Sequence, residues 1–193
     1  MTKGERTLKS SVVFRGPFFL LREHSVRGEQ GREATRIVLE HPGAACAVPI
    51  LADGRLVLVR QYRKAVEEFT LEFPAGKLES NESPEQCLER ELVEEIGYRP
   101  GSLEKLGSFH PAFGYSNEII HLFVARLLEP VPRRGGDELY LEPCLFGFAE
   151  ILRMIDDGRI RDGKTVIAAL QLARLRAEGG TALPGANGHT GSG

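Results

Sequence analysis

The most constraining feature of this chain is a short segment whose residues specify both the ends and the buried face of a helix. Ser83, Pro84 and Gln86 form a typical helix start: an N-cap serine, a proline at the first helical position and a glutamine three residues after the cap. Gly97 is expected to end the helix, because glycine takes the left-handed conformation at low cost. Apolar residues recur every four positions and predict the buried face: Leu88, Leu92 and Ile96. A helix over residues 84–96 is therefore predicted.

One flank of this helix carries three carboxylates, Glu91, Glu94 and Glu95. Spacings of three and four residues place them on one side, where like charges are unfavourable unless a cation lies between them. Carboxylate oxygens suit hard divalent ions such as Mg²⁺ or Mn²⁺. A guanidinium cannot ligate a cation, so Arg90 is expected to brace Glu82 or a neighbouring loop instead. Taken alone, the acidic spacing is more typical of a solvated helix face.

The whole stretch from Gly76 to Tyr98 resembles the Nudix box, G-x5-E-x7-R-E-U-x-E-E-x-G-U, in which U is a bulky apolar residue. Every fixed position is present, with Leu92 at the first U and Tyr98 at the last. The resemblance implies a Nudix hydrolase, an enzyme that cleaves a diphosphate linkage with Mg²⁺ as cofactor, Mn²⁺ being possible. It also implies an α/β/α sandwich with a mixed central sheet.

The same resemblance implies the catalytic residues. The metal would be ligated by Glu91, Glu95 and the backbone carbonyl of Ala75, with Glu94 shared or in the next shell as a further catalytic group. The general base would lie in the acidic loop over residues 135–142, where Glu138 is the first choice and Asp137 the second. The alternative is that this loop is an ordinary solvated turn without a catalytic role.

Residues flanking the box narrow the substrate. The stretches over residues 59–63 and 71–76 resemble the VRQYR and LE-x-PAG signature of the ADP-ribose pyrophosphatase subfamily, and residues 114–118 resemble its segment after the box, with Phe113 in place of a proline. The implied substrate contacts come from Arg60, Tyr62, Arg63, Glu72, Gly114 and Glu118. From residue type alone, the arginines are more typical of surface charge, an aromatic such as Tyr62 in a strand is more often part of the core, and Glu72 could simply pair with an arginine.

The bulk properties exclude several classes of protein. The 193 residues fit one domain with a small extension, and a net charge of −2 provides no basic surface for nucleic acid. We expect no secretory signal and no membrane-spanning stretch. The three cysteines are far apart and form no Cys-x-x-Cys pair, so reduced thiols in the cytoplasm are expected.

Periodicity and turn residues divide the chain into three parts: an N-terminal β extension over residues 1–43, a catalytic domain over residues 44–178, and a disordered tail over residues 179–193. In the catalytic domain, Asp53-Gly54 predicts a hairpin between strands 45–51 and 56–59, Pro74-Ala75-Gly76 predicts a turn, and residues 145–148 a last strand. Helices are expected over residues 149–157 and 163–177, the second capped by Asp162.

The predicted fold class is thus α/β, a Nudix-type sandwich with a small antiparallel sheet at its N-terminus. That extension resembles one with which ADP-ribose pyrophosphatases form domain-swapped homodimers, so a homodimer is expected. The predicted partner is a small nucleoside diphosphate sugar, giving AMP and ribose 5-phosphate in the case of ADP-ribose. A GDP-sugar or dinucleotide pyrophosphatase, or a sensor that binds ADP-ribose without cleaving it, are the alternatives.

Overall fold

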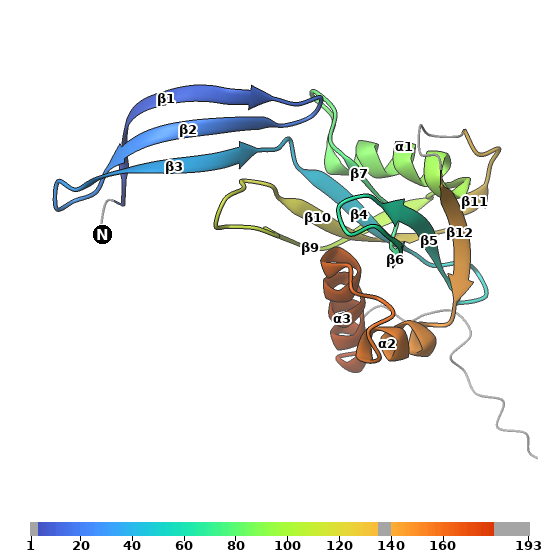
Figure 1. Cartoon of the computed structure of the whole chain (residues 1–193). Helices are drawn as coiled ribbons and strands as arrows, with labels where there is room; N and C mark the ends of the chain where they lie inside the picture. The colour runs from blue at the N-terminus through green and yellow to red at the C-terminus, as the bar shows by residue number, and fades with distance from the viewer. Residues whose placement is uncertain (1–3, 135–139, 180–193) are drawn as a thin grey trace, which may run out of the picture. The chain divides into compact units, whose positions relative to one another are not determined.

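The computed structural model describes residues 4–134 and 140–179, which divide into two compact units. The first unit comprises the described residues up to Gly43 together with Phe109–Ile120. Its sheet has the order β1-β2-β3, formed by β1 (Arg6–Arg15), β2 (Leu20–Arg27) and β3 (Glu33–Glu40), with antiparallel pairing throughout (Figure 1). The predicted N-terminal antiparallel sheet is present.

The second unit contains the other sheets and all three helices of the described residues. One sheet has the order β7-β4-β10-β9 and contains β4 (Ala44–Pro49), β7 (Ala75–Lys77), β9 (Ser102–Phe109) and β10 (Ile120–Arg126). Another has the order β12-β5-β6 and contains β5 (Leu56–Arg63), β6 (Glu68–Glu72) and β12 (Leu141–Phe146). A short pair joins β8 (Tyr98–Arg99) to β11 (Glu129–Pro130).

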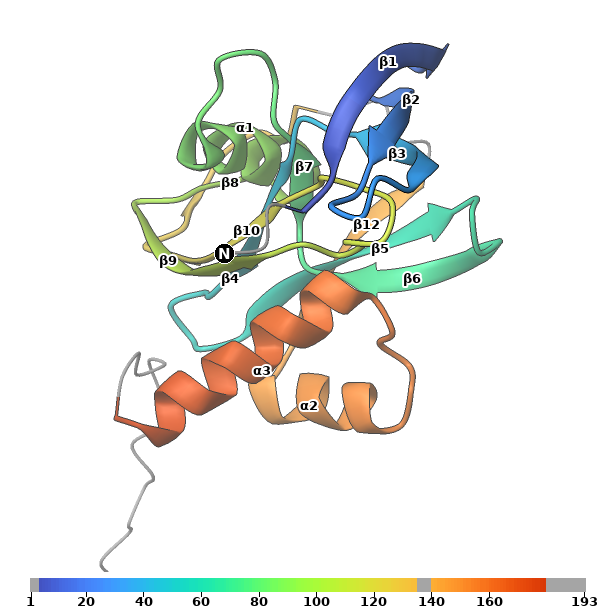
Figure 2. The ribbon, with the colours of Figure 1, turned by 90° about the vertical axis from the view of Figure 1, so that its left-hand side faces the viewer.

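The helices lie on opposite sides of these sheets, as the sandwich prediction requires (Figures 1 and 2). Helix α1 (Pro84–Ile96) contacts β4, β5, β7 and β12, whereas α3 (Gly163–Ala177) contacts β4 and α2 (Phe148–Asp156). The core beneath α1 is formed by fully or almost fully buried apolar side chains, among them Ala45, Val57, Val59, Leu88, Leu92 and Phe123. None of the helices in the described ranges is long and apolar enough to cross a membrane.

The local signals at the ends of α1 are confirmed. The Ser83 hydroxyl accepts from the Gln86 amide at 3.2 Å, and the Gln86 side chain accepts from the Ser83 amide at 2.9 Å. Gly97 ends the helix in the left-handed conformation, with φ 70°. Both caps satisfy backbone groups that a helix end leaves without partners, so α1 is held in one register.

Three expectations about strands were wrong. A turn does form at Asp53-Gly54, but β4 and β5 enter different sheets and share only one isolated bridge, Ile50 with Leu56. Residues Ala75–Lys77 form strand β7 rather than a turn, because β4 offers them an open edge. The last strand is Leu141–Phe146, since Phe148 already begins α2 and is buried there.

Candidate active site

Two of the residues expected to hold a metal are brought together by tertiary contact. Glu95 projects from α1 and is 7% exposed, and its Oε2 atom accepts a hydrogen bond from the amide of Ala75 at 3.1 Å. Ala75 belongs to β7, twenty residues earlier in the chain. A carboxylate offers about four lone-pair positions, and the Ala75 amide takes one of them.

Glu91 lies against Gly76, the glycine that begins the pattern over residues 76–98. A Cβ atom built on Gly76 would stand 1.8 Å from Glu91 Oε1 and 2.0 Å from its Cδ atom, so only glycine leaves space for this carboxylate. The side chain of Glu91 is 15% exposed. Burial raises the pKa of Glu91, the nearby carboxylates Glu94 and Glu82 raise it further, and Arg90 opposes them. The chain therefore holds a partly desolvated carboxylate here, which a bound cation would stabilise in its charged form.

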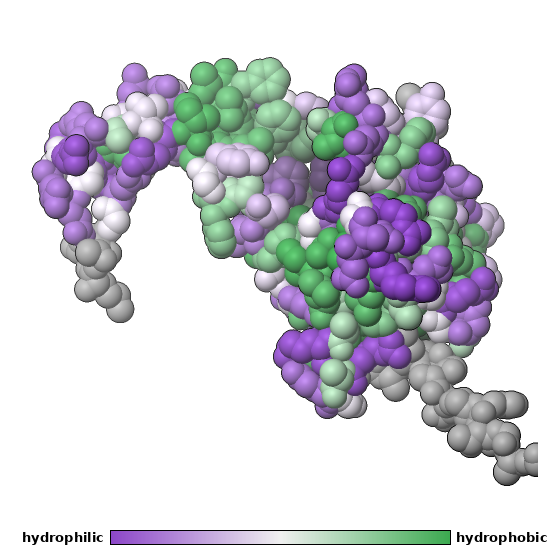
Figure 3. Space-filling view, turned by 60° about the horizontal axis from the view of Figure 1, so that its bottom comes forward, coloured by the Kyte–Doolittle hydropathy of each residue, from purple (hydrophilic) through white to green (hydrophobic). Residues whose placement is uncertain are grey.

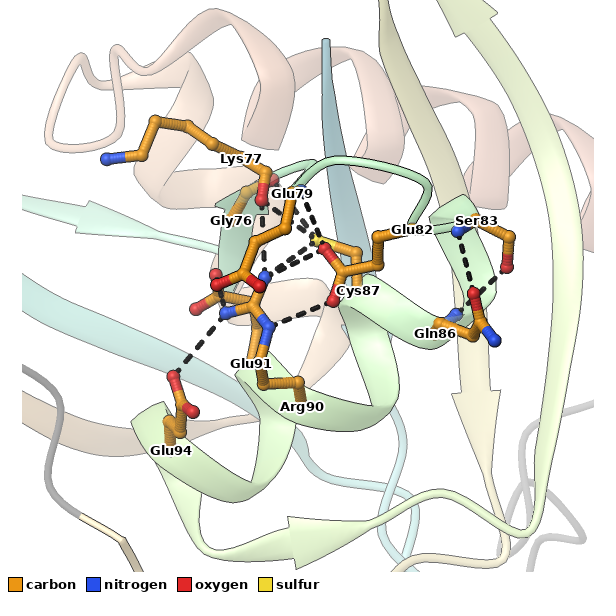
Figure 4. Close-up of polar contacts among 10 residues, drawn as sticks. All are labelled: Gly76, Lys77, Glu79, Glu82, Ser83, Gln86, Cys87, Arg90, Glu91 and Glu94. Carbon is orange, nitrogen blue, oxygen red and sulfur yellow. Dashed lines mark hydrogen bonds and ion pairs between the residues drawn. The ribbon is translucent and has the colours of Figure 1, made fainter. Parts of the chain in front are cut away.

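Arg90 connects the acidic residues, as Figure 4 shows. Its Nε and Nη2 atoms donate to the two oxygens of Glu82 at 2.9 and 3.0 Å, which confirms the expected brace. Its Nη1 atom donates to Glu91 at 2.6 Å and lies 3.5 Å from Glu94, and Nη2 also donates to the carbonyl of Lys77 at 3.2 Å. Arg90 thus ties the loop before α1 to the acidic flank of the helix.

The oxygen donors along this flank fit a divalent metal. Among the residues that the structure describes, no three His, Cys, Asp or Glu side chains converge tightly enough to hold an ion by themselves. A site for Mg²⁺ needs few carboxylates, however, because this ion keeps several waters and shares the substrate phosphates. Glu91, Glu95 and the Ala75 carbonyl are oxygen donors of the kind that this ion takes, and Arg90 lies between Glu91 and Glu94, donating to both.

An open hollow of about 500 Å³ adjoins the outer face of α1. Its lining includes Glu89, Glu94, Arg99 and Arg134, together with Arg90, whose guanidinium is already held by Glu82 and Glu91. Arginines are well suited to bind phosphate because their planar groups present several donors at once. The acidic edge of α1 is therefore bordered by a surface on which an anion can be held.

A second polar cluster surrounds Glu72, which is 2% exposed at the end of β6. Arg63 donates to both of its oxygens, at 2.8 and 2.7 Å, and Thr70 donates to one at 2.6 Å. Lys164, from α3, donates to the other. The arginine pairing that the residue types allowed is thus present, while Lys164, 92 residues away, gave no recognisable signal in the sequence.

The charge state of Glu72 leads to a prediction about acid stability. Burial alone would raise its pKa, but Arg63 and Lys164 hold the pKa of Glu72 at about 2. Since this lies below the value of the unfolded chain, the stabilisation is present above pH 4.5 and is lost as the pH falls towards 2. We expect Glu72→Gln to lower the free energy of unfolding at pH 7 by about 3 kcal/mol and to flatten its dependence on pH between 5 and 2.

Urea unfolding at a series of pH values measures this effect. The matched control is Glu68→Gln, on the same strand but with an exposed side chain, which should change the unfolding free energy by less than about 0.5 kcal/mol. If the unfolding free energy depends on pH equally in Glu72→Gln and in the natural chain, Glu72 is not the source of this acid sensitivity.

Tyr62 and Arg60 lie on an exposed face of the β12-β5-β6 sheet, rather than in the core. The Arg60 guanidinium stands 3.9 Å from the ring centre of Phe69, and Tyr62 meets the same ring edge to face, with the ring centres 5.4 Å apart. Tyr140 also meets the Phe69 ring edge to face, with the ring centres 6.2 Å apart. The aromatic rings thus form an exposed cluster with a cation at its edge.

The remaining predicted residues belong to other parts of the chain. Gly114 and Glu118 lie in the first unit, where Glu118 Oε1 is 3.6 Å from His41 Nδ1 and its backbone carbonyl is 2.7 Å from His110 Nδ1. A Cβ atom at Gly114 would meet nothing within 4 Å, so space does not demand glycine there. Asp137 and Glu138, the predicted bases, lie outside the described residues.

Comparison with known proteins agrees with this geometry. Residues 40–169 match the NUDIX domain model. The chain is 37% identical to a methanol dehydrogenase activator of Bacillus methanolicus, over 87% of this chain and 92% of that protein. It is 31% identical to an ADP-ribose pyrophosphatase of Bacillus subtilis, over 89% and 94%. It is 33% identical to a GDP-mannose pyrophosphatase of Yersinia enterocolitica, over 76% and 75%.

The fold has a solved counterpart as well. A crystal structure of an ADP compounds hydrolase superposes with a TM-score of 0.82 at 24% identity, covering 94% of this chain and 99% of that one. At this level of identity the likeness concerns the arrangement of strands and helices. Together with the domain match over residues 40–169 and the intact acidic pattern on α1, it establishes that the chain belongs to the Nudix family.

Proposed function

We propose that this chain is a Mg²⁺-dependent pyrophosphatase that hydrolyses the diphosphate linkage of ADP-ribose or a related nucleoside diphosphate sugar. The observation that most directly supports this proposal is the contact of α1 with β7. In this contact Glu95 accepts a hydrogen bond from the Ala75 amide, and Glu91 occupies the space left by Gly76. The similarity to the ADP-ribose pyrophosphatase of Bacillus subtilis over nearly the whole chain supports this substrate class. A complete glutamate set favours hydrolysis over mere sensing.

Each group has a separate task in this proposal. Glu91, Glu95 and the Ala75 carbonyl would hold the metal, with Glu94 beside them. When bound, Mg²⁺ or Mn²⁺ would neutralise the diphosphate and make a water molecule more acidic. Arg63 would bind a phosphate or the terminal ribose through charge-assisted hydrogen bonds. Glu138, or Asp137 in its place, would accept the proton of the attacking water, so Glu138→Gln should slow turnover and leave metal affinity unchanged.

The experiment is a panel of nucleoside diphosphate derivatives incubated with Mg²⁺ in ¹⁸O-labelled water, with the products resolved by mass spectrometry. We expect ADP-ribose to yield AMP and ribose 5-phosphate, with the label on one product and no turnover in the presence of EDTA. Failure to cleave any member of the panel would contradict the proposal. Faster cleavage of GDP-mannose would favour the second candidate, a GDP-sugar pyrophosphatase, which the similarity to the Yersinia protein supports.

We further propose a homodimer formed through the N-terminal sheet. Large apolar side chains are exposed on this unit, among them Val12, Val13, Phe14 and Phe18. Figure 3 shows hydrophobic residues gathered on part of its surface. Exposed apolar surface of this kind commonly marks a contact with another chain. Sedimentation at micromolar concentration should give the mass of two chains, and a monomer would contradict the proposal.

A cytoplasmic location and the absence of nucleic acid partners complete the proposal. All three cysteines are free thiols, Cys46 and Cys87 being fully buried, as expected for a protein kept in a reducing compartment. The net charge of −2 offers no broad basic field for nucleic acid. Fractionation of the source cells and a mobility-shift assay with random RNA would test the two statements.

A further inference from the structure

Every lone-pair direction of the Glu72 carboxylate is already engaged. Its Oε1 atom accepts from Arg63 Nε and from the Thr70 hydroxyl, and its Oε2 atom accepts from Arg63 Nη2 and from Lys164 Nζ. A carboxylate offers about four such positions. Glu72 can therefore bind a ribose hydroxyl only by giving up one of these donors, and its evident role is to orient the two cations around it.

Lys164 is buried to an unusual degree for a lysine, with a side chain that is 12% exposed. Its Nζ atom bridges two carboxylates, Glu72 on β6 and Asp162 at the cap of α3, the second at 3.0 Å. These two acids hold the pKa of Lys164 above its ordinary value although burial alone would lower it. The lysine is therefore charged at neutral pH.

The first turn of α3 makes a second contact with the end of β6. The Thr165 hydroxyl accepts from the amide of Phe73 at 2.8 Å and donates to Asp162 Oδ2 at 2.6 Å. In Figure 2 this turn lies beside the end of β6. Side-chain and backbone groups of Glu72–Phe73 are thus both held by α3.

These contacts of α3 lie close to the edge of α1 that is proposed to bind the metal. Ala75, whose amide is held by Glu95, follows Glu72 by three residues, a chain length that spans at most about 10 Å. The four ionised groups of the cluster, Arg63, Glu72, Asp162 and Lys164, balance to zero net charge. Removing the lysine would leave one negative charge beside the arginine that is expected to meet an anionic substrate, and at partly buried positions such a charge is weakly screened.

We propose that Lys164 is a positioning residue for substrate binding: through Glu72 it holds Arg63 in place and keeps the charge of this cluster from becoming negative. The inference rests on the proposed function, since it assumes that Arg63 contacts the diphosphate or the terminal ribose. Lys164 itself touches no substrate in this scheme. Its removal should weaken substrate binding and leave the chemical step and the metal requirement unchanged.

The test is Lys164→Met, assayed with the best substrate of the panel. We expect KM to rise about tenfold while kcat and the Mg²⁺ concentration for half-maximal rate stay within about twofold. Adding Asp162→Asn restores the zero net charge of the cluster, and asparagine can still cap α3. The KM of the double variant should therefore return most of the way to that of the natural chain. Lys105→Met removes an exposed lysine of the same unit and should leave KM unchanged.

Asp162→Asn alone tests the charge argument with the opposite sign and does not depend on whether Lys164→Met folds. It should lower KM by about threefold, since the cluster then carries one positive charge. If the natural chain is active and Lys164→Met has an unchanged KM, the inference fails by itself. A raised KM that the double variant does not recover also contradicts it. A natural chain that cleaves no member of the panel contradicts the proposed function and removes the basis of the inference.

Discussion

Replacing Glu95 by glutamine is expected to reduce Mg²⁺-dependent turnover by more than about a hundredfold. Loss of a residue that only supports a metal ligand commonly costs ten- to a hundredfold, so loss of a ligand should cost more. Glutamine keeps the size of the side chain and one oxygen, which can still accept from the Ala75 amide. The change therefore removes the negative charge and one proposed metal ligand but keeps the contact between α1 and β7.

Steady-state kinetics across a series of Mg²⁺ concentrations, together with thermal unfolding, measure both parts of this prediction. We expect the melting temperature to change by only a few degrees. Glu85→Gln, at an exposed position of the same helix and away from this hollow, is the matched control and should be fully active. Hydrolysis by Glu95→Gln at the normal rate would show that the metal is held elsewhere.

Gly76→Ala is expected to have an effect of similar size by a different route. The added methyl group would stand 1.8 Å from Glu91 Oε1 and 2.3 Å from its Cγ atom, far inside contact distance, so the carboxylate has to leave its place. Displacing this carboxylate should lower metal affinity and turnover by about a hundredfold or more, although no ligand has been removed. Overpacking of this kind also costs about 1–3 kcal/mol of stability.

Gly147→Ala is the control for this substitution, because Gly147 has φ −71° and a Cβ atom there would meet nothing within 4 Å. Metal affinity, measured by calorimetry with Mn²⁺, distinguishes displacement of the Glu91 carboxylate from a general loss of stability as the cause of lost activity. A Gly76→Ala variant with normal metal affinity and normal turnover would mean that Glu91 can move aside without consequence. Its role as a ligand would then be wrong.

Local patterns along the sequence determined the features whose causes lie within a few residues. The Ser83 cap, the Gly97 end and the buried Leu88 and Leu92 all depend on contacts three or four positions apart, so the predicted helix and the structure agree residue by residue. The pairing of Arg90 with Glu82 spans eight residues and was also foreseen. The Nudix pattern, which combines such local features at fixed spacing, was sufficient to identify the family.

Only the tertiary structure decided which strands become neighbours and which charges meet. β4 and β5 are joined by a tight turn, yet they enter different sheets, because each finds its ladder partners elsewhere in the chain. Lys164 reaches Glu72 across 92 residues, and Glu95 reaches Ala75 across 20. Such contacts depend on how the sheets and helices pack, and the free energy that selects them is shared among many buried side chains, so it leaves no periodic pattern in the sequence.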